Sequence, residues 1–273
     1  MDELEIACIG DIHFKISYGI YYSFFDSPYA PHRNGAAIDI YFEEDALFPL
    51  EEGVVREIKK INTPHNVKDF LVLIETEGLI LKVLHVKPSI RKGDKLFHGD
   101  TFGKVIHSGF LSPWSDRHAH FELRKPSDPY RARGGLILKP IIQPLVPIVI
   151  GNQFIVVEKQ ERYVWIKPLK YRDKGLTPIV FDNKSIEGGI PHYSYGAIFG
   201  DIGEIELIDI KIRSSDRLSN NIRLFDTKNL IVEANGEEIT GIGIYCNQSL
   251  LKLISENFEE DDIIEINIYQ KLM

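Results

Sequence analysis

The chain has 273 residues and a formal net charge of −8 at pH 7. This length predicts one large or two ordinary domains, and we expect two. An acidic chain lacks the basic surface that favours binding to nucleic acid and anionic membranes, so we expect neither as a partner. The two cysteines, Cys8 and Cys246, have no partners at metal-ligand spacing. Neither a disulfide framework nor a cysteine zinc site is therefore indicated.

The first residues, MDELEIACIGDIHF, are acidic and contain no long apolar run. They do not resemble a secretory signal, so we expect a cytoplasmic location. Asp11 and His13 form a Gly-Asp-x-His motif, which is similar to the first metal motif of calcineurin-like metallophosphoesterases. That family also needs Gly-Asp-x-x-Asp and Gly-Asn-His-Glu segments, and here HGDTFG and IGNQF each lack part of them. We expect Asp11 and His13 to lie in a leading strand or loop instead.

Short segments in which apolar and polar residues alternate occur along the whole chain. Examples are GVVREIKKI, FLVLIETEGLILKVLHV, RYVWIKPL, EIELIDIKI and DIIEINIY, each bounded by Gly, Pro, Asn or Asp. A period of two is typical of β-strands, so the fold class is mostly β. Tight turns in the first half, such as RKGD and HGD, favour a sandwich or a small barrel.

Residues 136–151, LILKPIIQPLVPIVIG, combine apolar residues with three prolines. The stretch is too short for the roughly 20 apolar residues of a membrane-spanning helix, and its prolines predict an extended crossing between domains. We therefore expect one domain at 1–145 and a β-rich C-terminal domain of unknown role at 146–273. Residues 247–259, NQSLLKLISENFE, have the apolar spacing of a short helix. The segment HYSYGAIFGDIGEIELIDIKI favours a plain strand-turn-strand core. The alternatives are a ligand-facing loop or a dimer edge, and any homodimer would form through this domain.

The stretch SDRHAHFEL places His118 and His120 on one face of a strand, because side chains alternate along a strand. His32 precedes Asp39 by seven residues, and the intervening Asn34 and Gly35 permit a loop that brings His32 back toward Asp39. A hydrolytic zinc site commonly has three protein ligands and one open position. His32, Asp39 and one of the paired histidines satisfy that count.

Four segments in this order resemble the lysostaphin-like (LytM-type) zinc metallopeptidases. They are HRNGAAID, ALFPLEEGVVREI, LILKVLHVKPSIRKGDKLFHGDTFGKVIHSG and RHAHFELRKPSDP, and they span roughly residues 30 to 130. The resemblance implies a barrel-sandwich hybrid (duplicated hybrid motif) for the first domain, and a zinc-dependent endopeptidase. The implied substrate is a peptide, of the cell-wall type or containing glycine.

Carried over residue by residue, the resemblance makes His32, Asp39 and His120 the zinc ligands and His85 and His118 the catalytic histidines. Imidazoles with pKa values near neutrality suit proton transfer and stabilisation of an oxyanion. How these tasks divide between His85 and His118 stays open.

The sequence departs from the family pattern in three respects. The His-to-Asp spacing is longer than His-x-x-x-Asp, Asp116 and Arg117 stand where small residues are usual, and no export signal is visible. A catalytically silent binding or assembly module that retains a metal site is therefore the alternative function. A lipoyl or biotinyl carrier fits poorly, because a biotinyl lysine is typically flanked by methionines and here only Met1 and Met273 occur.

Overall fold

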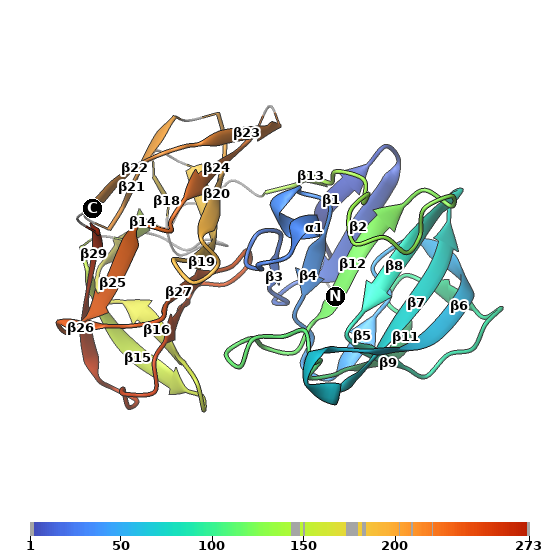
Figure 1. Cartoon of the computed structure of the whole chain (residues 1–273), viewed down its shortest axis with the longest axis horizontal. Helices are drawn as coiled ribbons and strands as arrows, with labels where there is room; N and C mark the ends of the chain where they lie inside the picture. The colour runs from blue at the N-terminus through green and yellow to red at the C-terminus, as the bar shows by residue number, and fades with distance from the viewer. Residues whose placement is uncertain are drawn as a thin grey trace. The chain divides into compact units, whose positions relative to one another are not determined.

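The computed structural model describes residues 3–142, 148–149, 151–172, 180–181, 184–201, 203–208, 210–219 and 221–271 (Figure 1). Strands account for 53% of the structure and helix for 2%, which confirms the mostly β fold class and the second β-rich domain. Contacts divide the chain into unit 1, Met1–Tyr22 with Tyr29–Ile141, and unit 2, Ser23–Pro28 with Ile142–Met273. The expected domain boundary, between residues 145 and 146, lies outside the described residues.

Unit 1 is built from short antiparallel strands and one helical turn. Its elements are β1 (Glu3–Ile9), β2 (Ile12–Ser17), β3 (Tyr22–Ser23), α1 (Ala30–Arg33), β4 (Ile38–Ile40), β5 (Asp45–Leu47), β6 (Glu52–Asn62), a 3₁₀ turn (Pro64–Asn66), β7 (Lys68–Thr76), β8 (Leu79–Leu84), β9 (Val86–Pro88), β10 (Lys95–Phe97), β11 (Thr101–Val105), β12 (Ala119–Arg124) and β13 (Lys139–Pro140). A curled seven-stranded sheet has the order β10-β6-β7-β8-β12-β4-β3. Two three-stranded sheets, β13-β1-β2 and β5-β11-β9, complete the unit.

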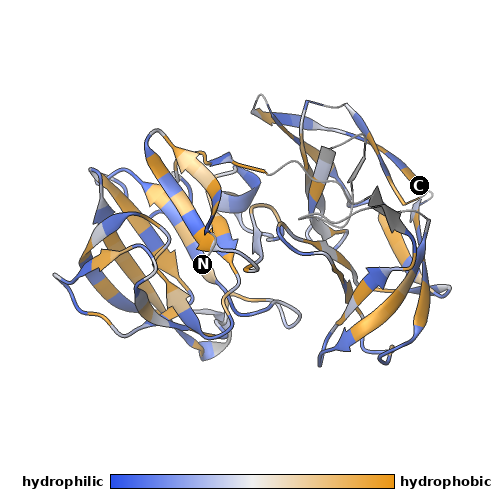
Figure 2. Ribbon diagram, turned by 180° about the vertical axis from the view of Figure 1, so that it is seen from behind, coloured by the Kyte–Doolittle hydropathy of each residue, from blue (hydrophilic) through white to orange (hydrophobic). Residues whose placement is uncertain are grey.

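The two faces of β12 have different surroundings in unit 1. Phe121 is fully buried, and its ring packs edge-on against Phe14 and Phe102 at centroid distances of 6.5 and 6.3 Å. Burying each such ring stabilises the fold by about 1.5–3 kcal/mol. Apolar and polar residues alternate along the strands in Figure 2, as this arrangement requires. The neighbouring residue His120 consequently points to the opposite face of β12.

Unit 2 is dominated by one large antiparallel sheet. Its strands are β14 (Ile148–Val149), β15 (Gln153–Lys159), β16 (Val164–Pro168), β17 (Tyr171–Arg172), β18 (Val180–Phe181), β19 (Lys184–Ile190), β20 (Tyr195–Phe199), β21 (Glu204–Leu207), β22 (Ile210–Arg213), β23 (Asp216–Ser219), β24 (Ile222–Asp226), β25 (Leu230–Ala234), β26 (Glu237–Glu238), β27 (Gly241–Ile244), β28 (Leu251–Ile254) and β29 (Ile263–Gln270). The sheet order is β23-β24-β20-β19-β27-β28-β16-β15-β29-β25-β26, with β18 beside β19. Its core includes the fully buried Phe154, Phe225 and Ile264.

The expected helix at residues 247–259 is wrong. Leu251–Ile254 form strand β28, which pairs with β16 on one side and β27 on the other. All four of its residues are buried, including Lys252, whose ammonium lies over the rings of Tyr163 and Trp165. A strand buried on both faces reads as a continuous apolar run, which sequence periodicity cannot distinguish from a helix.

The start of the expected crossing at residues 136–151 belongs to unit 1. Lys139 and Pro140 form β13, which pairs with Cys8 and Ala7 of β1. Residues 143–147 and 150 lie outside the described part of the chain. Cys8 and Cys246 are free thiols, of which Cys8 is half-buried and Cys246 is buried. Within the described residues, no helix is both long and apolar enough to cross a membrane.

Candidate metal centre

Strands β12 and β4 place a histidine directly beside an aspartate. The two strands are antiparallel, and His120 is the register partner of Asp39. On its other edge β12 pairs with β8, so His120 lies in the interior of the seven-stranded sheet. Nδ1 of His120 lies 2.8 Å from Oδ1 of Asp39. Asp39 lies on strand β4.

His32 reaches the same place from a helical turn. The sequence favoured a loop here, but Ala30–Arg33 form α1, with Pro31 in its first turn. Proline suits this position because its fixed φ is compatible with a helix start. The chain then reverses at Gly35, whose φ is 66° and whose amide donates to the carbonyl of His32. His32 and Asp39 are seven residues apart, so on a continuous strand they would point to opposite faces. The turn at Gly35 lets them face each other.

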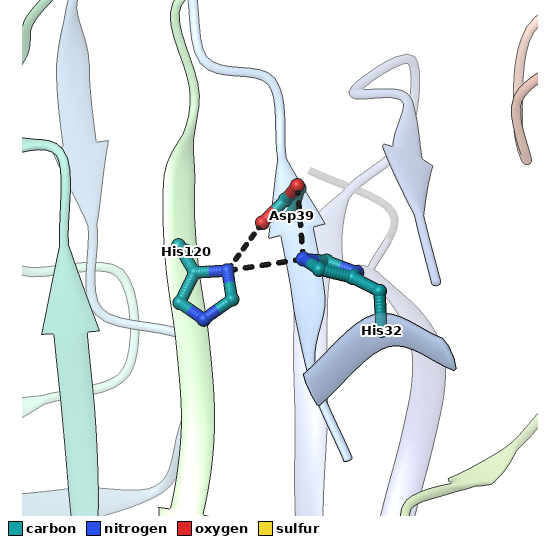
Figure 3. Close-up of side chains that lie close together, drawn as sticks. All are labelled: His32, Asp39 and His120. Carbon is teal, nitrogen blue, oxygen red and sulfur yellow. Dashed lines mark hydrogen bonds and ion pairs between the residues drawn. The ribbon is translucent and has the colours of Figure 1, made fainter. Parts of the chain in front are cut away.

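The three side chains present their ligand atoms to one point (Figure 3). Nε2 of His32 lies 3.1 Å from Nδ1 of His120 and 3.3 Å from Oδ2 of Asp39. Ligands about 2.0–2.1 Å from one tetrahedral zinc ion are separated from each other by about 3.3 Å. The observed separations and the two-imidazole, one-carboxylate donor set therefore fit a zinc ion. The buried His32–Asp39–His120 group could hold a metal ion, and no fourth protein ligand joins it among the described residues.

A second layer of charged side chains surrounds His120. Its Nε2 lies 3.2 Å from Oε1 of Glu122, which also accepts a hydrogen bond from Nζ of Lys82 at 2.7 Å. The other oxygen of Glu122 pairs with Arg124. Metal-bound histidines commonly have a carboxylate on the second ring nitrogen, which fixes the ring and raises its basicity. Glu122 occupies that position here.

His118 faces the ligand group without belonging to it. Its Nδ1 donates to the backbone carbonyl of Asp116 at 2.8 Å, which leaves Nε2 as an acceptor 3.3 Å from Oδ2 of Asp39. Burial lowers the pKa of His118 to about 4, because Asp39 offsets only part of the desolvation. The ring is therefore neutral near pH 7, with a lone pair directed at the centre.

His85 is held by an aspartate that sequence reasoning missed. Nδ1 of His85 donates to Oδ2 of Asp69 at 2.6 Å, and the same oxygen accepts the hydroxyl of Ser108 at 2.8 Å. The backbone amide of His85 donates to Oδ1 of Asp69. Burial opposes a charge on Asp69, but the contacts with His85 and Ser108 hold its pKa below the ordinary range.

Contacts with two carboxylates favour the protonated form of His120. Burial acts to lower the pKa of this ring, but hydrogen bonds to Asp39 and Glu122 outweigh it and raise the pKa to about 9. Burial likewise opposes ionisation of Asp39, yet the His118, His32 and His120 rings hold its pKa well below the usual range. A metal ion needs a deprotonated ligand atom, so metal uptake at neutral pH would release a proton from His120.

All five residues expected from the sequence lie together at this end of unit 1. The imidazole of His85 lies 5.2 Å from that of His118 and 5.9 Å from that of His120, between ring centroids. The ligand trio and both other histidines are at most 5% exposed.

His13 lies on strand β2, as expected of a leading strand, and pairs with Glu5 of β1. Asp116 and Arg117 lie in the loop before β12, where Asp116 supports His118 through its carbonyl and accepts from Tyr21.

Two family models match the chain, one after the other. Residues 15–140 match the model described as "Domain of unknown function (DUF8155) N-terminal domain". Residues 146–269 match its counterpart, "Domain of unknown function (DUF8155) C-terminal domain". No curated protein and no solved structure matches the chain. The first match contains every residue of the candidate metal centre.

Proposed function

For a chain that belongs to the DUF8155 family through both of its domains, we propose a zinc-dependent endopeptidase of the lysostaphin-like type. The observation that carries the proposal is the convergence of His32, Asp39 and His120 at distances that suit one tetrahedral ion. The resemblance of the surrounding motifs to that peptidase family supports it. A peptide of the cell-wall type, or one containing glycine, is the proposed substrate class.

The residues around the ligands can manage the protons of peptide hydrolysis. A bound zinc ion supplies a Lewis acid and an activated water. His118 donates from Nδ1 to the carbonyl of Asp116 and so directs Nε2 toward the centre, where it is placed to accept a proton. Asp69 fixes the proton of His85 on Nδ1, which leaves Nε2 of His85 as a second acceptor. It can take a proton from the attacking water and then give that proton to the leaving amine.

Burial favours a second candidate, a non-catalytic module in which a metal has a structural role. The five side chains of the centre are only 1–5% exposed. A hydrolytic centre needs an open position that a substrate can reach, whereas a structural zinc is closed by protein ligands. The three-ligand group favours the enzyme, and the burial favours the module.

Metal content and activity together separate these two candidates. Protein purified without chelator should contain one zinc ion per chain or take one up on addition, and the His120→Ala variant should lose it. His118→Ala should keep the metal and lose cleavage of Gly-rich or cell-wall peptides. His13→Ala, a histidine that pairs with Glu5, is the control and should change neither.

Absence of stoichiometric zinc, with no uptake on addition, contradicts both candidates. Zinc bound tightly with no chelator-sensitive cleavage of any peptide supports the non-catalytic module.

A further inference from the structure

A short segment of the N-terminal half of the chain is built into unit 2. Ser23–Pro28 belongs to unit 2 by its contacts, although Ser23 is also the last residue of β3, which pairs with β4, and helix α1 follows in unit 1. Residues 23–27 are all buried, without the alternation of an exposed strand. We call Ser23–Pro28 the strap. It ends one residue before Tyr29, the N-cap of α1, and four residues before His32.

A single buried carboxylate binds the start of the strap. Oε1 of Glu187, on strand β19, accepts the backbone amides of Phe24 at 2.6 Å and Phe25 at 2.7 Å. The same oxygen accepts the hydroxyl of Ser23 at 2.8 Å. Two successive backbone amides therefore converge on one carboxyl oxygen. The thiol of Cys246 donates to the other oxygen of Glu187 at 3.3 Å.

Further contacts of unit 2 hold the rest of the strap. The hydroxyl of Tyr195 donates to the carbonyl of Ser27 at 2.8 Å. The rings of Phe24 and Phe25 pack against Phe199, at centroid distances of 6.2 and 5.9 Å. A Cβ atom on Gly189, two residues beyond Glu187, would lie 2.4 Å from Cδ2 of Tyr193, 2.5 Å from Nε2 of His192 and 2.6 Å from Oδ1 of Asp26, so a side chain here would crowd the strap as well as the turn after β19.

Helix α1 is too short to be stable without contacts to the rest of the chain. It contains four residues, far fewer than the roughly 12 that a helix needs to be even marginally stable alone. Its N-cap residue Tyr29 makes no side-chain capping hydrogen bond. The position of α1, and with it the ring of His32, therefore depends on how the chain is fixed at each end. Gly35 and β4 fix the C-terminal end. The strap leads into the N-terminal end, where the hydroxyl of Tyr29 also donates to the carbonyl of Phe110 at 2.8 Å.

We propose that Glu187 is a positioning residue for the candidate metal centre, acting through the strap on the ligand His32. The C-terminal unit thereby has a role in metal binding although its own residues supply no ligand to the described His32–Asp39–His120 group. This inference rests on the proposed function in taking His32 as a ligand. It adds that the order of α1 in the metal-free chain depends on a carboxylate in the other unit.

The test compares three variants of the full chain. Glu187→Leu removes the acceptor, whereas Glu187→Gln keeps Oε1 as an acceptor for the strap. Val232→Ala truncates a buried side chain of β25 and is the control for general loss of stability in unit 2. One measurement is zinc affinity by competition with a chromophoric chelator. The other is amide hydrogen exchange over residues 24–36 in zinc-free protein.

Glu187→Leu should weaken zinc binding by about 10- to 100-fold, the range typical of lost supporting contacts, and accelerate exchange across the strap and α1. Glu187→Gln should match the wild type within a few-fold, and Val232→Ala should change neither measurement. A folded Glu187→Leu variant with wild-type affinity and wild-type exchange at 30–36 would overturn the proposal.

The two measurements separate the failure of this inference from failure of the proposed function. If the wild-type chain binds no zinc, the proposed function fails, and exchange alone decides whether Glu187 orders α1. If Glu187→Leu does not fold, Tyr195→Phe replaces it, because this change removes only the hydroxyl that donates to Ser27. Faster exchange of α1 in Tyr195→Phe supports the proposal, and unchanged exchange overturns it.

Discussion

His85 adopts a backbone conformation that residues with a side chain rarely adopt. Its φ is 66°, at the junction between β8 and β9. Such a conformation costs of the order of 1–3 kcal/mol and persists only where the surroundings impose it. Asp69 imposes it by accepting both the backbone amide and the ring of His85. With this backbone conformation, the ring of His85 lies against that of His118 instead of following the regular alternation of side chains along a strand.

Replacing Asp69 by Asn should separate catalysis from metal binding. Asn can donate a hydrogen bond to Nδ1 and so favours the wrong tautomer of His85, as in the loss of the triad aspartate of serine proteases. We expect cleavage to fall by about 100-fold or more, with zinc affinity unchanged within a few-fold.

A double-mutant cycle with His85→Ala is the control. In that background Asp69→Asn should have no further effect on kcat, because the two residues act as one unit. Additive losses would contradict the positioning role of Asp69.

Glu122 links the candidate ligand His120 to two buried cations, Lys82 and Arg124. Burial opposes its ionisation, but its contacts with His120 and Lys82 lower its pKa to about 2. Glu122→Gln should therefore weaken zinc binding by about 10- to 100-fold. It should also lower the free energy of unfolding by about 3–5 kcal/mol, because the cations remain buried without their anion.

The double variant Glu122→Gln, Lys82→Met distinguishes the two effects of Glu122. It should recover much of the stability, since one unpaired cation is gone, while zinc binding stays weak. Urea unfolding and chelator competition measure the two quantities. Recovery of zinc affinity together with stability would show that Glu122 acts on the fold and not on the ligand.

Sequence reasoning found the five central residues but not these two supporting carboxylates. The sequence could have indicated Glu122, because it follows His118 and His120 at the next alternate position on the same strand face. The sequence could not have indicated Asp69. It lies sixteen residues before His85, and only the pairing of β7 with β8 and the turn of the chain at His85 bring the two together. No sequence period indicates such a contact.

At the scale of elements, sheet register builds the centre. The pairing of β12 with β4 sets His120 opposite Asp39, and a slip of one residue would turn every side chain of β12 to the other face. His120 would then point into the core and Phe121 would replace it. Alternation in SDRHAHFEL was sufficient to predict which residues share a face. It could not predict α1, since four residues that include a proline and precede a glycine turn carry no helical period.

Gly103, on strand β11, should tolerate no side chain. A Cβ there would meet the carbonyl oxygen of Lys87 at 2.5 Å and Cα of Pro88 at 2.9 Å, and both are backbone atoms of the paired strand β9. We expect Gly103→Ala to lower the free energy of unfolding by about 1–3 kcal/mol, the usual cost of overpacking. Gly203→Ala, where a Cβ has no neighbour within 4 Å, should stay near the wild-type value in the same urea titration. Equal stability of the two variants would contradict the close approach of β11 and β9.

At the scale of the whole molecule, the chain enters unit 2 twice. It passes into unit 2 at residue 23, returns at residue 29 and enters again at residue 142. Composition and proline content indicated only the last of these passages. The sequence of the strap, SFFDSP, is a short aromatic stretch like others in the chain. Its pattern does not predict which of the two units it packs into. Its contacts with Glu187, Tyr195 and Phe199 in the folded chain assign it to unit 2.

Glu187 should also give the stability of the chain a characteristic pH dependence. Burial raises its pKa from 4.5 to about 7, and hydrogen bonds from Phe25, Ser23 and Cys246 offset only part of this effect. Its stabilising contribution is therefore complete below pH 4.5 and is lost as the pH rises through about 7, because in this window the folded state holds a proton that the unfolded state has released.

The loss should reach about 3 kcal/mol by pH 8, and Glu187→Gln, which does not titrate, should lack it. Urea unfolding of both proteins between pH 4.5 and pH 8 measures the difference, in which the contributions of all other titrating groups cancel. The wild type should be about as stable as the Gln variant at the acid end and clearly less stable at the alkaline end. Parallel curves would mean that Glu187 is ionised in the folded protein throughout, with the strap amides and the Cys246 thiol outweighing its burial.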